Sequence, residues 1–176
     1  GRVNEEKGVK ELIEATKMLL DNGYSVHLAI VGRGHQEQQY KDLTAELNIE
    51  NSVTFVGWVN SSEIYHYYAA ADIFVGPSKR ADDGWVEAQG LTFVEAMLAG
   101  CKVVGTNSGG IPDAVIDGKT GWLAEPGNAI SLSDKIKRAL DNESTDIIDT
   151  ACAFAKDNYL VHNTVSRFLK SLKGVA

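Results

Sequence analysis

The stretch "DDGWVEAQGLTFVEAMLAGCKVVGTNSGG" (residues 82–110) runs in turn through a polar loop, a helix and a strand. Directly after Gly90, residues 91–101 place apolar side chains at helical spacing. Residues 102–106, "KVVGT", then form a short apolar run of strand length. A helix followed at once by a strand is the repeating unit of α/β proteins, so the rest of the chain should show the same alternation.

The alternation continues on both sides of this stretch. The predicted helices span 6–23, 35–49, 61–71, 91–101, 109–115, 129–141, 144–157 and 161–173, and the predicted strands span 25–32, 52–57, 72–78, 102–106 and 121–125. In the third helix, Ser61 or Ser62 is the expected N-cap. The connections are short and the strands are apolar throughout, which is typical of strands that are covered on both faces.

These features predict an α/β fold of the Rossmann-like type, a three-layer arrangement with a parallel sheet and helices on both faces. Ligands of such open sheets bind at the carboxyl ends of the strands, where this chain carries "GRGH", "GWVNSS", "GPSKRADDGWVEAQG" and "GTNSGG". The chain opens with polar residues that lead straight into a helix. We therefore expect residues 1–176 to be one domain that lacks its first strand.

The composition is that of an ordinary globular protein. With 17 Lys and Arg against 24 Asp and Glu, the net charge of −7 argues against a nucleic-acid partner but allows a small anionic ligand. Cys101 and Cys152 have apolar surroundings and no metal-binding spacing, which favours reduced thiols in a cytoplasmic protein. No apolar run is long enough to span a membrane, so any membrane association would be peripheral.

Glu87 and Glu95 flank the start of the predicted helix at Gly90 and Leu91. The free amides and the dipole of a helix N-terminus attract anions, and a glycine lets a phosphate approach the backbone closely. Glu95 is expected on the buried side of the helix, where the hydroxyls of a ribose would satisfy its carboxylate. The alternative is that both acids are simply solvated, and their spacing leaves the two interpretations open.

Other polar residues give weaker signals when taken singly. Arg2 and Lys7 stand near strand ends, where two cations would neutralise a diphosphate, although surface cations are commonly only solvated. The "VGRG" at 31–34 lacks the third glycine of the dinucleotide fingerprint. No histidine has metal-ligand spacing, and His27 and His66 are predicted to be packing residues.

Taken in order, these pieces resemble the C-terminal, donor-binding domain of retaining glycosyltransferases of family 4, which have the GT-B fold. The resemblance covers residues 1 to about 140. It rests on the ordered segments "GRVNEEKG", "VGRG", "FVGWV", "PS", "EAQGLTFVEAM", "LAGCKVVGTNSGGIPDAV" and "TGWLAEPGN". Where the family often has EGFG or ESFG, this chain has Glu87-Ala88-Gln89-Gly90, and its loop "KRADDGW" is longer and more charged than the shortest versions in the family.

The resemblance implies a role for each residue of the candidate site. Arg2 and Lys7 would grip the donor diphosphate and stabilise the charge on the leaving nucleotide, and Glu87 would hold hydroxyls of the transferred sugar. The remaining donor contacts would come from Gly90, Leu91 and Thr92 at the distal phosphate, Glu95 at the ribose, and Trp58 and Val59 beside the nucleobase. Such enzymes need no bound metal, because these groups replace it.

The resemblance therefore implies a donor domain that binds a UDP- or GDP-sugar for retaining, hexosyl-type transfer in glycan or polysaccharide biosynthesis. The acceptor-binding N-terminal domain of the family is not in this sequence, so the isolated domain is expected to transfer nothing. The full-length enzyme would be cytoplasmic, with peripheral association at the cytoplasmic face of a membrane as one option. A non-catalytic nucleotide-sugar binding module and a GT-B epimerase or phosphorylase are the alternatives. The apolar positions of the last helix, Val165, Phe168, Leu169 and Leu172, would pack either on this domain or on the missing one.

Overall fold

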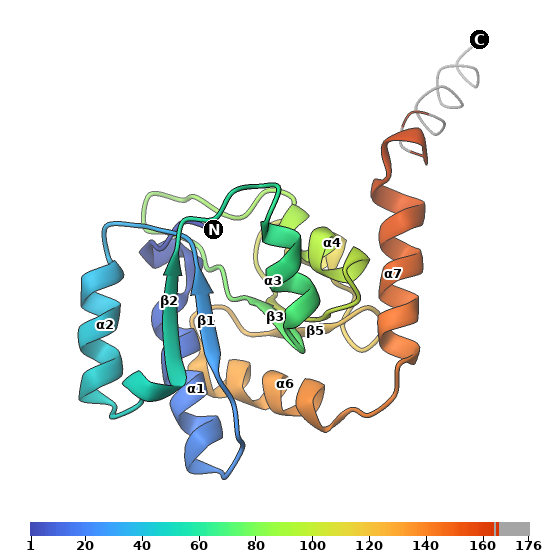
Figure 1. Ribbon diagram of the computed structural model, residues 1–176. Coiled ribbons are helices and arrows are strands. Elements are labelled where there is room, and N and C mark those ends of the chain that lie inside the picture. The colour runs from blue at the N-terminus through green and yellow to red at the C-terminus, as the bar shows by residue number, and fades with distance from the viewer. Residues whose placement is uncertain (164, 166–176) are drawn as a thin grey trace.

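A computed structural model describes residues 1–163 and 165 (Figure 1). Helices and strands alternate as predicted. The helices are α1 (Val9–Asp21), α2 (Glu37–Glu46), α3 (Ile64–Ala70), α4 (Leu91–Leu98), α5 (Ile111–Ala114), α6 (Ala129–Asp141) and α7 (Asp146–Tyr159), with short 3-10 turns η1 (Glu5–Lys7) and η2 (Glu50–Ser52). The strands are β1 (Leu28–Val31), β2 (Val53–Gly57), β3 (Ile73–Gly76), β4 (Lys102–Thr106) and β5 (Trp122–Ala124). The predicted α/β class is confirmed.

All strand pairs are parallel, but they form two groups. β1 pairs with β2, and β3, β4 and β5 pair in that order. Within the described residues no pairing joins β1 to β3, so each of these strands has one free edge. The segment that starts at Gly1 runs beside the end of β1: the Gly1 amine donates to the carbonyl oxygen of Val31 at 2.7 Å, and the Val3 amide donates to that of Arg33 at 3.0 Å.

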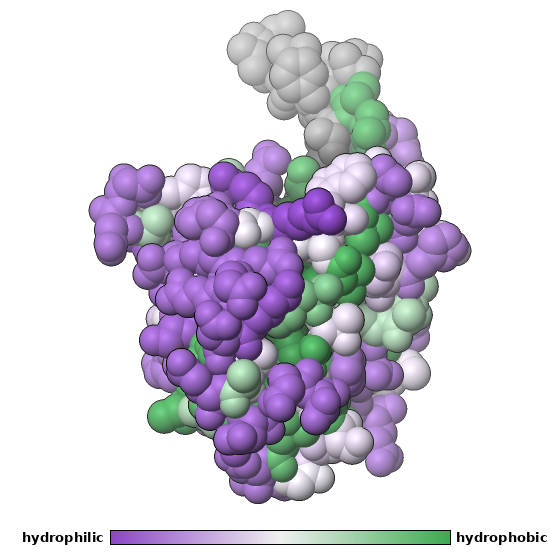
Figure 2. Space-filling view, turned by 60° about the vertical axis from the view of Figure 1, so that its left-hand side comes forward, coloured by the Kyte–Doolittle hydropathy of each residue, from purple (hydrophilic) through white to green (hydrophobic). Residues whose placement is uncertain are grey.

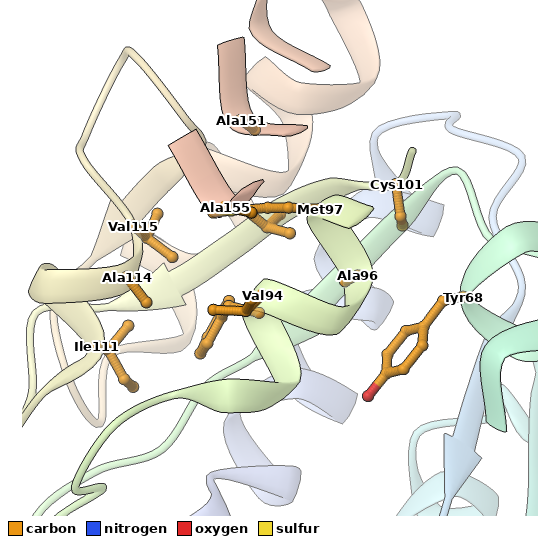
Figure 3. Close-up of a cluster of buried hydrophobic side chains, with 12 residues drawn as sticks. Tyr68, Val94, Ala96, Met97, Cys101, Ile111, Ala114, Val115, Ala151 and Ala155 are labelled. Carbon is orange, nitrogen blue, oxygen red and sulfur yellow. The ribbon is translucent and has the colours of Figure 1, made fainter. Parts of the chain in front are cut away.

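Helices cover both faces of the sheet because side chains alternate along each strand. On β4, Val104 belongs to a buried cluster with residues of α1 and α6, whereas its neighbour Val103 packs with residues of α3, α4, α5 and α7. Figure 3 shows the second cluster, in which side chains of α4, α5 and α7 point toward one another and Tyr68 approaches α4 from α3. A third cluster lies between α1, α2 and the β1–β2 pair. The predicted three-layer arrangement is thus present.

Helix α4 shows how its sequence selects one face. Its inward side chains are Phe93, Val94, Ala96 and Met97, all buried. Glu95 stands on the opposite side, about 200° around the helix from Phe93 at 100° per residue. It is exposed, so the expectation that this carboxylate lies on the buried side is wrong. The residues next to Glu95 in the sequence are apolar, which suggested burial. The position of a residue around the helix axis, and not the nature of its sequence neighbours, decides whether its side chain is buried.

Helix α3 also differs from the sequence-based expectation. It begins at Ile64 with Glu63 as its N-cap residue, one or two residues later than a cap at Ser62 or Ser61 would give. Tyr68 is its buried residue, whereas His66 is exposed. His27 is exposed as well and hydrogen-bonds Thr54 Oγ1 at 2.8 Å. The prediction that both histidines are packing residues is therefore wrong, because each lies on an outward face.

Helix α7 packs against α4 and leads away from the body of the domain (Figure 1). Beyond it, Val161 and Val165 are exposed, and the other predicted apolar positions of the last helix, Phe168, Leu169 and Leu172, lie outside the described residues. No helix in the described part of the chain is both long and apolar enough to cross a membrane. Hydrophilic residues cover much of the surface in the view of Figure 2, with apolar residues in smaller patches between them.

Candidate functional site

Close backbone contacts between loops build the rim at the carboxyl ends of the strands. Gly8 has a φ of 67°, and a Cβ there would lie 2.0 Å from the carbonyl oxygen of Pro77, just after β3. A Cβ on Gly109 would lie 2.2 Å from the carbonyl oxygen of Glu87, and the Gly110 amide donates to that same oxygen at 2.7 Å. Glycine is needed at these positions because another backbone occupies the space of a side chain. The loops carrying Lys7 and Glu87 are thereby held at fixed places.

Lys7 and Glu87, which are 80 positions apart in the sequence, form an ion pair with Nζ 2.6 Å from Oε2. Their side chains are only 21% and 25% exposed, so solvent screens this pair less than a fully exposed one. Arg2 lies on the same rim but is 63% exposed, and its guanidinium is 3.8 Å from the Glu6 carboxylate. The structure thus brings together the three residues predicted to be catalytic.

Trp85 connects the two cations. The Lys7 ammonium lies 4.5 Å from the centroid of the Trp85 ring, and the Arg2 guanidinium carbon lies 6.0 Å from it. These distances are within the range of cation–π attraction. Two positive charges therefore share one aromatic ring at the place where a diphosphate is expected.

The start of α4 follows closely after Glu87 in the sequence. Gly90 is the N-cap residue, and no described side chain caps the helix. Leu91 and Thr92, the first two helical residues, are exposed. An uncapped N-terminus with a partial positive charge is suited to an anion such as phosphate.

Glu95, one turn further along α4, accepts a hydrogen bond from the Tyr68 hydroxyl at 3.0 Å. Burial, followed by the negative charge of Glu95, raises the pKa of Tyr68, so this hydroxyl stays a donor at neutral pH.

Trp58 and Val59 line a separate open hollow of about 460 Å³. Its other lining residues are Val56, Asn60, Glu63, His66 and Tyr67. Trp58 is 65% exposed. The hollow shares no lining residue with the Lys7–Glu87 pair, but α3 links the two regions, since it carries His66 and Tyr67 into the hollow and presents Tyr68 to Glu95.

Three residues around the site were not predicted from the sequence. Trp85 and Tyr68 carry no signal on their own, because an aromatic residue in a loop or an apolar helix usually only packs. Lys79 is the third: it pairs with the buried Glu11 at 2.8 Å and lines an open hollow of about 310 Å³ whose lining is mainly charged. Across residues 1–163 and 165, no three His, Cys, Asp or Glu side chains gather into a group that would hold a metal ion.

The fold defines the class of this protein as a Rossmann-like domain, whose rim carries the Lys7–Glu87 pair and Arg2. Comparison with known proteins then identifies the family. Residues 1–156 match the family model described as "Glycosyl transferases group 1", and the chain belongs to this family.

Two curated relatives illustrate the match. The chain is 35% identical over 152 residues to the amylovoran biosynthesis glycosyltransferase AmsK of Erwinia amylovora, which covers 86% of this chain and 37% of that protein. It is 32% identical over 182 residues to the lipopolysaccharide 1,2-N-acetylglucosaminetransferase of Salmonella typhimurium, which covers 98% of this chain and 46% of that protein. The chain thus spans less than half the length of these relatives.

Solved structures show the same fold. The chain superimposes on Anabaena Alr3699/HepE in complex with UDP with a TM-score of 0.83 and 29% identity, covering 99% of this chain and 47% of that one. It also resembles the C-terminal domain of a glycosyl transferase group 1 family protein (LpcC) from Francisella tularensis, with a TM-score of 0.77 and 24% identity. That match covers 92% of this chain and 84% of the other and bears on the fold alone.

Proposed function

We propose that this chain is the donor-binding half of a retaining glycosyltransferase and that it binds a nucleoside diphosphate sugar, with UDP or GDP as the nucleotide. The observation that carries the proposal is the 2.6 Å pair of Lys7 and Glu87 at the rim, in which Glu87 stands three residues before Gly90, the uncapped start of α4. Membership of the glycosyl transferase group 1 family and the UDP complex of the Anabaena relative support it.

In this proposal the charges of the rim match the parts of the ligand. Lys7 and Arg2 would neutralise the diphosphate and stabilise the negative charge that develops on the leaving nucleotide, an effect that often supplies the largest part of catalysis. The amides of Leu91 and Thr92 would bind the distal phosphate at Gly90. These cations and dipoles would do the work of a metal ion, so no metal is required.

The two carboxylates have separate tasks. Glu95, fixed by Tyr68, is exposed and would accept hydrogen bonds from the ribose hydroxyls. Glu87 would hold hydroxyls of the transferred sugar, on the other side of the phosphates. The hollow at Trp58 and Val59 would take the nucleobase.

The full-length protein would contain more than this chain. Transfer needs a second wall for the acceptor, so we propose an N-terminal acceptor domain and an isolated domain that binds donor but transfers nothing. The free edges of β1 and β3 support one further strand between them. The full-length enzyme would act in the cytoplasm, in polysaccharide or lipid-linked glycan assembly.

The proposal is tested by calorimetric titration of the chain with UDP, GDP and ADP. One of the three should bind in a saturable way, and Lys7→Met and Glu95→Ala should each weaken it at least about tenfold, because each removes a contact to a charged or hydroxyl group. Glu46→Gln, on the exposed end of α2, is the matched control and should bind as the wild type does. No binding of any nucleotide at millimolar concentration would contradict the proposal.

A further inference from the structure

The charged loop at residues 79–85 is the part of the rim for which the family resemblance offers no role. In the structure it forms a closed turn. The Ala81 amide donates to the carbonyl oxygen of Trp85 at 2.9 Å, the Gly84 amide donates to that of Ala81 at 2.9 Å, and the Trp85 amide donates to Asp83 Oδ1 at 2.9 Å. Because these bonds fix the backbone on both sides of Trp85, its indole has a defined place.

That place is directly against the two cations proposed to grip the diphosphate. The ring centroid lies 4.5 Å from the Lys7 ammonium and 6.0 Å from the Arg2 guanidinium carbon. Trp85 itself is half-buried. Tryptophan gives the strongest cation–π attraction of the aromatic residues, and the attraction grows as the cation is shielded from water. Lys7, with a side chain only 21% exposed, is the better shielded of the two cations.

The ring also leaves Lys7 able to bind a ligand. A lysine ammonium has three N–H donors, and Glu87 accepts one of them at 2.6 Å. The face of the Trp85 ring attracts the ammonium without accepting a conventional hydrogen bond. The two remaining N–H donors of Lys7 therefore stay available to a ligand. Lys7 is therefore held on two sides before a ligand arrives, which reduces the side-chain entropy that a long flexible lysine would otherwise lose on binding.

We propose that Trp85 is a positioning residue that holds Lys7, and to a lesser degree Arg2, in place for the diphosphate. The inference rests on the proposed nucleotide-sugar site and adds to it a residue that acts through the cations and not on the ligand. Its effect should therefore follow the number of phosphates in the ligand and should be largely lost when Lys7 is absent.

The test compares Trp85→Ala and Trp85→Phe by calorimetry with UDP and UMP, or with the GDP or ADP pair if that base binds more tightly. Trp85→Ala should weaken diphosphate binding by about 3- to 30-fold, and Trp85→Phe should recover most of it, since a phenyl ring keeps part of the attraction. The ratio of diphosphate to monophosphate affinity should fall in Trp85→Ala. In a Lys7→Met background, the additional loss from Trp85→Ala should be less than about twofold, because neighbouring residues that act together are not additive.

Several outcomes would overturn the inference while leaving the proposed function intact. One is wild-type nucleotide affinity in Trp85→Ala. Another is an equal loss from Trp85→Ala with and without Lys7. A third is a loss seen only with the UDP-sugar and not with UDP, which would place the ring against the sugar. A wild-type chain that binds no nucleotide would instead contradict the proposed function. A thermal unfolding midpoint close to that of the wild type shows that the variants remain folded.

Discussion

Glu87→Gln should make the free nucleoside diphosphate bind more tightly, although Glu87 is part of the proposed site. In the structure the Glu87 carboxylate already neutralises Lys7, with Oε2 2.6 Å from Nζ. A phosphate that hydrogen-bonds the same ammonium must therefore approach a second negative charge. Glutamine keeps the shape and a hydrogen-bond acceptor but removes that charge.

The magnitude follows from the geometry of Lys7. Two acceptors on one tetrahedral ammonium, one at 2.6 Å and the other at about 2.8 Å, are roughly 4.4 Å apart. At about this separation two like unit charges repel by ~1 kcal/mol in water and ~4 kcal/mol at an effective dielectric constant of 20. Because both side chains are partly exposed, the lower part of this range applies, and we expect UDP to bind about 5- to 30-fold more tightly.

The assay is calorimetric titration with UDP and with the UDP-sugar at two salt concentrations. Glu87→Gln should gain affinity for UDP, and the gain should shrink at high salt. The preference for the sugar-bearing donor over UDP should fall, because a neutral amide holds sugar hydroxyls less strongly than a carboxylate. Glu46→Gln makes the same charge change far from the rim and should alter neither. UDP affinity in Glu87→Gln equal to or weaker than that of the wild type would refute the reasoning.

Three further outcomes are expected. Lys79→Met should destabilise the domain by about 3 kcal/mol, because it leaves the buried Glu11 carboxylate without its ion-pair partner. The unfolding midpoint should fall by roughly 6 to 12 °C in a thermal scan, and Lys79→Met/Glu11→Gln should recover part of this loss. Burial raises the pKa of Cys101 to about 11, so at pH 8 iodoacetamide should modify the half-exposed Cys152 first, and equal rates by mass spectrometry would contradict this. About five β-branched apolar residues placed before Gly1 should raise the unfolding midpoint by filling the free edges of β1 and β3, whereas a Gly-Ser extension of equal length should not.

The sequence predicted the fold well because its signals are local and agree with one another. The strand expected at 102–106 and the helix expected at 129–141 have those bounds in the structure. Short apolar runs separated by amphipathic helices admit few arrangements other than a covered parallel sheet. Errors occurred where the outcome depends on tertiary placement. The start of α3 is one such case, and the exposure of Glu95 is another.

The candidate site was predictable only in part. The sequence placed Arg2, Lys7 and Glu87 near strand ends, and the structure brings all three to one rim. It gave no indication that Trp85 would lie against both cations, because that contact depends on the closed turn at 81–85 and on glycine contacts between distant loops. Local spacing of residue types in the sequence does not predict contacts between residues about 80 positions apart.

The most direct test of the central claim is a two-dimensional ¹⁵N NMR titration of the chain with UDP, GDP and ADP. If the start of α4 and the cations of the rim form a diphosphate cradle, the largest shifts for the nucleotide that binds should fall on the amides of Leu91 and Thr92 and on residues next to Lys7. Uridine, guanosine or adenosine alone should not change the chemical shifts of these amides. Saturable binding with shifts confined to other parts of the surface, or no binding of any nucleotide, would contradict the account.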